Sequence, residues 1–348
     1  MGRVNPASAH PTLPDGWTTS TPDVGDLPRL AELRGAAAEP WTGSRDVDAG
    51  AVAAEVTGPM SWTRRQVVAR DRGGVVRAWA SAHDRAAGRV VVGLDVDRAA
   101  PEAGLLASWG LAWAEERGRE LARQRGLART QLDAGAYAGD EDQRGWLDAA
   151  GYAHARSWLQ MSRPVSPEEA RPGVLPDPRP GVTVRPVATH EDGLPVAEDL
   201  QTVHRVLESA FEDHFNSYRE SFGEFVVRLR SDPGHRWDHW WLALVGDPDD
   251  PHATPEPMGA LVGAALPSGA SGKEGSYVEY LGADRRARGR GVATALLFAV
   301  VADAAARGRD RVGLEVDADS PTGAAALYER WGWRTRYVTE SWHREIEA

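Results

Sequence analysis

The chain has 348 residues, enough for about two domains, and its hydrophobic content of 42% can supply two cores. It contains no cysteine, which excludes disulfide bonds, thiolate metal ligands and a cysteine nucleophile. The formal charge of -11 disfavours nucleic acid as a partner, because nucleic-acid binding needs a broad basic face.

The sequence offers no membrane span or secretory leader. Its longest apolar run, residues 292–302, is about half of the ~20 residues that a membrane-spanning helix needs. No charged segment followed by an apolar one opens the chain. We therefore expect a cytoplasmic protein without a membrane partner.

The first half of the chain contains two segments with strand character. One strand is expected over residues 89–96 and is followed by residues 97–102, DRAAPE. The other is expected over residues 129–135, and residues 146–152, WLDAAGY, then end a helix with a glycine and an aromatic residue. These segments have counterparts in the second half.

A proline-rich stretch, residues 165–181, separates the two halves. It contains five prolines and no apolar periodicity, which is typical of a semi-rigid linker. We therefore expect one domain over residues 1–164 and a second over residues 182–348.

The second half is expected to begin with a strand, two helices and a pair of strands. The strand covers residues 182–186, the helices cover residues 199–211 and 222–230, and the paired strands cover residues 240–245 and 259–266. With the segments that follow, the predicted order is β-α-α-β-β-β-α-β-α-β.

An Arg/Gly-rich turn lies within residues 277–297, between an apolar strand and an apolar helix. Glycines at 289 and 291 let the backbone approach an anion, and the helix start directs free N–H groups at that anion. Arg285, Arg286, Arg288 and Arg290 add positive charge. The pattern indicates a phosphate-binding turn, although neither the dinucleotide nor the P-loop glycine spacing is present.

The segment Arg288 to Ala293, RGRGVA, resembles the R/Q-x-x-G-x-G/A signature of the GNAT superfamily of N-acetyltransferases, whose loop binds the pyrophosphate of acetyl-CoA. The overlapping register that begins at Arg286 also fits. Residues 312–317 and 321–330 then resemble the second motif of that family, a strand and a Leu-Tyr helix, with Ser320 at the Asn position and Trp333 at the Phe position.

The resemblance implies an α/β (α+β) fold with two tandem GNAT-type domains, each a mixed, mostly antiparallel sheet flanked by helices. Arg125-Gly126 overlays on Arg307-Gly308, and Leu147 then takes the place of Tyr328. The loop at 97–102 lacks glycine, so the first domain is expected to be a degenerate copy. This tandem architecture is similar to that of mycothiol synthase, which acetylates the cysteinyl amine of a small thiol glycoside.

The resemblance also implies acetyl-CoA as cosubstrate, no metal, and a site on the second domain. Tyr328 is the expected general acid, and Glu279 on the strand before the turn is the expected general base, because it precedes Leu281 by two residues and would share its face. Glu212, Asp213 and His214 are alternative bases. The residues assigned to acetyl-CoA are Leu281, Gly282, Ala283, Arg288, Gly289, Arg290, Gly291, Val292, Ala293, Thr294 and Ser320.

The expected activity is transfer of an acetyl group to the primary amine of a small molecule by direct attack. A different class of function stays open, in which the chain binds acyl-CoA as a sensor or partner-binding module without turnover.

Overall fold

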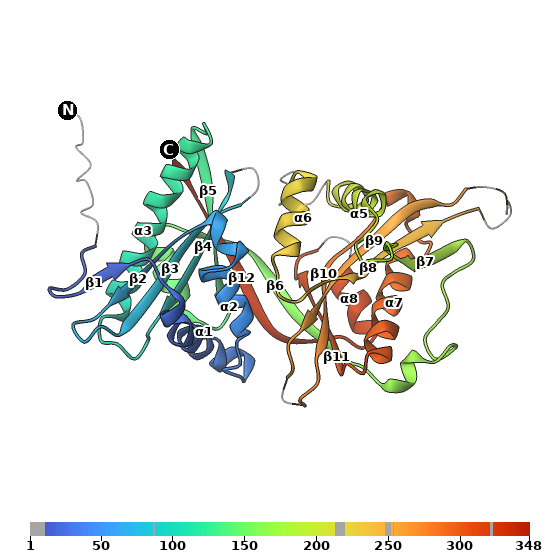
Figure 1. Ribbon diagram of the computed structural model, residues 1–348, viewed down its shortest axis with the longest axis horizontal. Helices are drawn as coiled ribbons and strands as arrows, with labels where there is room; N and C mark the ends of the chain where they lie inside the picture. The colour runs from blue at the N-terminus through green and yellow to red at the C-terminus, as the bar shows by residue number, and fades with distance from the viewer. Residues whose placement is uncertain are drawn as a thin grey trace. The chain divides into compact units, whose positions relative to one another are not determined.

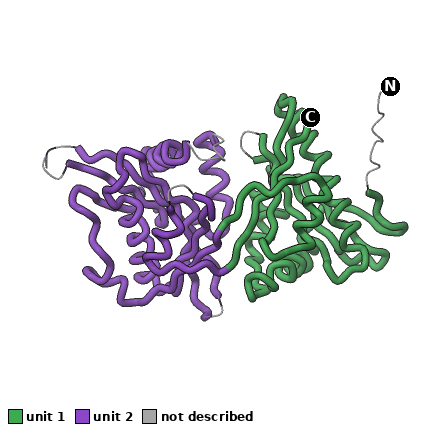
Figure 2. Tube along the Cα trace, turned by 180° about the vertical axis from the view of Figure 1, so that it is seen from behind, with its two compact units in different colours: residues 1–158, 337–348 green, residues 159–336 purple. Residues whose placement is uncertain are grey.

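The computed structural model describes residues 11–85, 88–212, 220–247, 252, 254–269, 271–320 and 323–348. The chain divides into two compact units (Figure 2). Unit 1 comprises residues 1–158 together with 337–348, and unit 2 comprises residues 159–336. These ranges differ from the domains expected from the sequence. Residues 159–164 of the first half belong to unit 2, and residues 337–348 of the second half belong to unit 1.

Unit 1 contains four helices packed on a sheet (Figure 1). Its helices are α1 (Leu27–Thr42), α2 (Ala49–Val56), α3 (Ala103–Gln124) and α4 (Glu141–Ala149). Its strands are β1 (Thr18–Ser20), β2 (Arg64–Arg70), β3 (Val76–Asp84), β4 (Val90–Val96), β5 (Arg129–Tyr137), the first part of β6 (Ala153–Pro164) and the end of β12 (Arg334–Glu347). The strand order is β1-β2-β3-β4-β5-β12-β6, and β4 and β5 are parallel.

Unit 2 repeats the same plan. Its helices are α5 (Ala197–Ala210), α6 (Phe222–Arg230), α7 (Val292–Ala306) and α8 (Ala324–Arg330). Its further strands are β7 (Val182–Pro186), β8 (His235–Val245), β9 (Glu256–Leu266), β10 (Gly275–Ala283) and β11 (Arg311–Asp317). The strand order is β6-β11-β10-β9-β8-β7, and the element order predicted for this half is confirmed.

Each unit completes its sheet with a strand from the other half of the sequence. In unit 1, Thr339 to Glu347 of β12 pair antiparallel with Arg129 to Tyr137 of β5. In unit 2, the later residues of β6 lie beside β11, where Gln160 Nε2 donates to Glu315 Oε2 at 2.9 Å. The last strand of each half is therefore exchanged.

The internal repeat is visible in matching hydrogen bonds. Tyr152 N donates to Leu147 O at 3.0 Å, and Trp333 N donates to Tyr328 O at 3.1 Å. The glycine before each aromatic residue has a left-handed backbone, with φ of 81° at Gly151 and 96° at Gly332. The overlay that puts Leu147 in the place of Tyr328 therefore has a structural counterpart.

Two sets of buried side chains form the core of unit 2, one on each face of its sheet. Leu296, Val300 and Trp333 belong to the set packed under α7, and Leu207 and Trp240 to the set packed under α5 and α6. None of the described helices combines the length and apolar character that a membrane crossing needs.

A buried polar chain links β8, β10 and the start of β11 in unit 2. The side chain of His239 is 1% exposed, and its Nδ1 hydrogen-bonds Asp238 Oδ1 at 2.7 Å. A guanidinium nitrogen of Arg309 donates to His239 Nε2 and, at 3.0 Å, to Ser276 Oγ. His239 therefore serves as a neutral acceptor toward Arg309.

This packing gives the free energy of unfolding a pH dependence. Burial lowers the pKa of His239, and burial lowers the pKa of His235 to about 4. The unfolded chain takes up protons at these groups below about pH 6.5, so stability is expected to fall as the pH goes from about 6.5 to about 4. His235→Phe keeps a ring beside Trp237 and removes one titration, so urea unfolding across this range should show a smaller pH slope. An unchanged slope would contradict this account.

Candidate functional site

The turn between β10 and α7 places unpaired N–H groups around one point. Gly289 and Gly291 have left-handed φ angles of 76° and 81°, and Gly291 is the N-cap of α7. No acceptor among the described residues takes the N–H groups at the start of the helix or at these glycines. These groups belong to Gly289, Gly291, Val292, Ala293 and Thr294. Together with the positive end of the helix dipole they are suited to bind an anion, and we refer to residues 285–294 as the anion-binding turn.

The four arginines of the turn are not equivalent. Arg285 lies 3.3 Å from Glu212, and Arg286 pairs with Asp284 at 3.2 Å and with Glu256 at 3.1 Å. Among the described residues, the guanidinium of Arg290 donates only to the main-chain oxygen of Gly246, at 2.8 Å. The side chain of Arg288 has no polar partner among the described residues. Arg288 and Arg290 therefore keep their positive charge for a bound anion, while Arg285 and Arg286 are neutralised locally.

Arg179 is a further residue of the turn that the sequence analysis did not single out. It lies in the proline-rich segment, and its guanidinium donates to the main-chain oxygen of Gly289. A Cβ at Gly291 would lie 3.1 Å from the Arg179 side chain. The only sequence signal was a basic residue among prolines, which is not specific.

Strands β10 and β11 part just before this turn. Their parallel pairing covers Ser276 to Val278 against Val312 to Leu314 and does not extend beyond. On its other side β10 stays paired with β9, where Leu281 lies opposite Leu261. The edge of β10 from residue 279 to 283 is therefore open toward β11, and we call this opening the fork.

A β-bulge lies at the fork. The register with β9 shifts between Val278 and Tyr280, so Glu279 is the extra residue. Val278 and Leu281 then pack in the same core cluster under α7, which strict alternation would forbid. The expectation that Glu279 shares the face of Leu281 rested on strict alternation, and the bulge removes that basis. Glu279 is exposed.

The residues expected along the open edge have different environments. Leu281 and Ala283 pack against the cluster under α7. Gly282 is buried on the opposite side, where a Cβ would lie 2.9 Å from the side chains of Leu207 and Ala210. Glycine at 282 thus lets α5 pack closely on β10.

Tyr328 projects from α8 into the core cluster of unit 2. Its side chain is 9% exposed, and its ring lies 6.1 Å from that of Trp333. No described residue hydrogen-bonds its hydroxyl, and burial raises the pKa of the phenol to about 12. Tyr328 therefore stays protonated at neutral pH and retains a proton to donate.

The remaining residues predicted for the site are Ser320, Glu212, Asp213 and His214. Ser320 lies in the turn after β11, where its N–H donates to Asp317 O at 3.1 Å. Glu212 is exposed and faces Arg285. Asp213 and His214 lie outside the described residues. No group of three or more His, Asp or Glu side chains suited to a metal ion occurs in the described part of the chain.

Unit 1 has the same fork without the turn. Its β4 and β5 pair only over Val90 to Val92 against Leu132 to Ala134. Helix α3 has 22 residues and α7 has 15, and each ends two residues before a glycine of positive φ, Gly126 or Gly308. The additional turns of α3 therefore occupy the place that the Arg/Gly-rich turn has in unit 2.

Side chains of α4 and of the segment after β4 also differ from those of unit 2. Trp146 stands where unit 2 has Leu327, and both Trp146 and Leu94 pack against two core clusters of unit 1. Arg98 joins the segment after β4 to the start of α4 through Asp140, with contacts of 2.7 and 2.5 Å. These contacts hold α4 against the segment that follows β4.

Comparisons with known proteins agree on the fold. Residues 205–333 match the model of the Acetyltransferase (GNAT) family. The chain is similar to a GCN5-related N-acetyltransferase from Sphaerobacter thermophilus, with 24% identity, a TM-score of 0.73, and 97% of this chain and 98% of that chain covered. No curated protein matches the chain.

Two further structures are similar at lower identity. A tandem GNAT protein from the clavulanic acid biosynthesis pathway has 15% identity and a TM-score of 0.63, with 94% of this chain and 98% of that chain covered. An N-myristoyltransferase from Saccharomyces cerevisiae with bound myristoyl-CoA has 12% identity and a TM-score of 0.56, with 97% of this chain and 80% of that chain covered. The predicted α/β fold class with tandem GNAT-type units is confirmed.

Proposed function

We propose that the protein is an acyl-CoA-dependent N-acyltransferase of the GNAT type, which transfers an acetyl group from acetyl-CoA to a primary amine of a small molecule by direct attack. The observation that carries this proposal is the continuity of the fork with the anion-binding turn on β10 and α7. The family match over residues 205–333 spans the same elements.

The turn supplies the groups that a pyrophosphate needs. The N–H groups at Gly289 and from Gly291 to Thr294 donate to its oxygens, and Arg288 and Arg290 balance its charge. The open edge of β10, with Leu281, Gly282 and Ala283, would bind the thioester and the chain that connects it to the pyrophosphate. These assignments leave Ser320, in the turn after β11, as a minor contact.

Acetyl transfer forms an N–C bond and breaks a C–S bond, and two protons must move. Glu279 takes a proton from the attacking amine, directly or through a water, because it is exposed at the bulge beside the fork. Tyr328 gives a proton to the departing thiolate, since its phenol is protonated at neutral pH. No metal ion enters this scheme.

A panel of primary amines incubated with acetyl-CoA tests the proposal. Release of coenzyme A that depends on the added amine, with formation of the acetylated product, supports transfer. Tight binding of acetyl-CoA without amine-dependent release would instead favour the non-catalytic sensor, because the turn and the fork would then serve binding alone.

Replacing Gly291 with valine is expected to abolish coenzyme A binding measured by calorimetry. Valine strains the backbone at a φ of 81° and adds a side chain where the N–H groups converge. Wild-type protein should bind one equivalent, because the described residues of unit 1 lack the Arg/Gly-rich turn.

Gly193→Val is the matched control for this substitution. Gly193 has a φ of 79°, and no atom lies within 4 Å of its Cβ position. The control therefore has the same backbone strain outside the turn and should keep coenzyme A binding. Binding of two equivalents with similar affinity would contradict the assignment of the site to unit 2 alone.

A further inference from the structure

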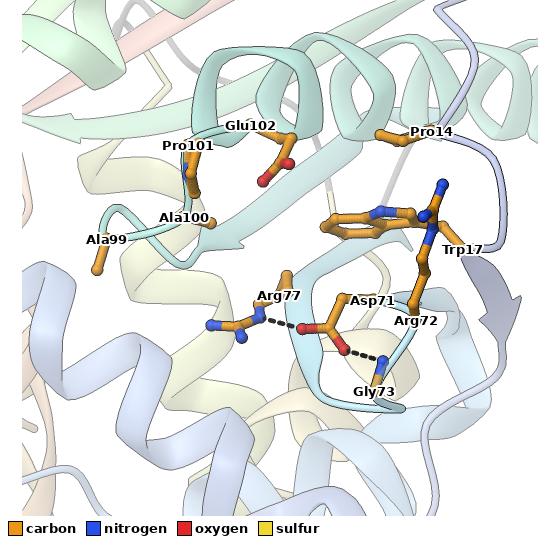
Figure 3. Close-up of a pocket in the computed structure, with 10 residues that line it drawn as sticks. All are labelled: Pro14, Trp17, Asp71, Arg72, Gly73, Arg77, Ala99, Ala100, Pro101 and Glu102. Atoms are coloured by element: carbon orange, nitrogen blue, oxygen red, sulfur yellow. Dashed lines mark hydrogen bonds and ion pairs between the residues drawn. The ribbon is translucent and has the colours of Figure 1, made fainter.

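Unit 1 contains a cavity of about 510 Å³ beside the segment that joins β4 to α3 (Figure 3). The residues before α3 form one wall, and Pro14 with the indole of Trp17 forms another. The tip of the β2–β3 hairpin supplies the charged floor. The cavity is large enough for a small organic molecule.

Two of the charged groups at the cavity satisfy each other. Arg77 Nε donates to Asp71 at 2.8 Å, and Arg77 Nη1 donates to Asp97 at 2.7 Å. Asp71 also accepts from the N–H groups of Gly73 and Val75. Arg77 and Asp71 therefore have few hydrogen-bonding positions left for a ligand. They form the floor of the cavity and do not determine which ligand charge is favoured.

Two other charged groups lack partners of opposite charge. The carboxylate of Glu102 makes no hydrogen bond or ion pair with any residue that the structure describes. Arg72 donates to the main-chain oxygen of Asp15 at 2.8 Å and pairs with no described carboxylate. Figure 3 shows the carboxylate of Glu102 and the guanidinium of Arg72 on different sides of the cavity, with the indole of Trp17 near both.

We propose that this cavity binds a small zwitterion with an apolar side chain, such as an aromatic α-amino acid. Its ammonium group pairs with Glu102, its carboxylate pairs with Arg72, and its side chain packs on Trp17 and Pro14. One charge of each sign without a described partner favours a ligand that carries both charges, because such a ligand can pair with both groups at once. The site is distinct from the fork of unit 2 and does not depend on acetyl transfer.

Three probes of similar size test the charge pattern on the full chain: L-phenylalanine, 2-phenylethylamine with only the ammonium group, and 3-phenylpropionate with only the carboxylate. Calorimetry is expected to show the tightest binding for L-phenylalanine. Glu102→Gln should weaken L-phenylalanine and 2-phenylethylamine by roughly 10- to 100-fold and leave 3-phenylpropionate unchanged. Arg72→Gln should weaken the binding of L-phenylalanine and 3-phenylpropionate, which carry the carboxylate. It should leave the binding of 2-phenylethylamine unchanged.

Glu141→Gln is the control, because Glu141 is an exposed carboxylate of unit 1 on α4. It should leave all three affinities unchanged. The proposal is overturned if no probe binds at millimolar concentration, if 3-phenylpropionate binds at least as tightly as L-phenylalanine, or if Glu102→Gln has no larger effect than the control. Saturating coenzyme A should not displace L-phenylalanine. Full displacement by coenzyme A would also overturn the proposal.

Discussion

Tyr328→Phe is expected to lower acetyl transfer by roughly 10- to 1000-fold with little change in coenzyme A affinity. The substitution keeps the ring that packs beside Trp333 and removes only the proton donor. Because burial raises the pKa of this phenol to about 12, Tyr328 remains a donor over the whole accessible pH range. Steady-state rates and calorimetry on the same preparation measure the two quantities separately.

The defect of Tyr328→Phe should depend on pH through the leaving group. A thiol has a pKa of about 8.5, so the thiolate leaves without help more readily as the pH rises. The ratio of wild-type to mutant turnover should therefore shrink above about pH 8.5. Unchanged turnover at neutral pH would reduce Tyr328 to a packing residue and favour binding without catalysis.

Tyr152→Phe is the matched control, because Tyr152 is a buried tyrosine of unit 1 that follows the equivalent helix α4. It should leave turnover unchanged.

Leu147→Tyr places a phenol at the position equivalent to Tyr328. It should nevertheless create no second active site while α3 occupies the place of the turn.

Removing residues 337–348 is expected to abolish the cooperative folding of unit 1. These residues supply the strand that pairs with β5 and the core side chains Trp342 and Ile346, which are 7% and 6% exposed. Loss of one such side chain costs about 2–5 kcal/mol, and a domain has only about 5–15 kcal/mol of stability. Circular dichroism and urea unfolding of the truncated chain measure the loss.

Glu345→Ala is the control for the truncation, because Glu345 lies on the same strand but is exposed. Its effect on the unfolding midpoint should be small.

The same exchange of strands predicts that a fragment of residues 182–348 is unstable, since it lacks Met161, which is 2% exposed in the core of unit 2. A fragment that unfolds cooperatively and binds coenzyme A as tightly as the whole chain would contradict the exchange.

Local features of the fold followed from the sequence. The strand at residues 182–186 and the helix at residues 222–230 were predicted with the bounds that the structure has. The turn at Gly289 and Gly291 was predicted as well, because glycine spacing between a strand and a helix has a local physical cause. The resemblance carried the assignment of Tyr328, whose role stays a prediction.

The exchange of strands between the two halves was decided only by the tertiary structure. Nothing in residues 337–348 alone indicates that they pair with β5, because strand pairing is set by packing between segments far apart in the chain. The same holds for Arg179 at Gly289, a contact that spans a long stretch of sequence.

The sequence by itself determined the element order of the second half, the repeat of the fold in the two halves and the glycine turn between β10 and α7, all of which depend on neighbours in the chain. The tertiary structure decided the bulge at Glu279, which breaks the alternation that the sequence suggested. It also decided which arginines of the turn are neutralised, since Glu212 and Glu256 come from other elements. Residues far apart in sequence meet only when the sheet forms, so their charge balance cannot be read along the chain.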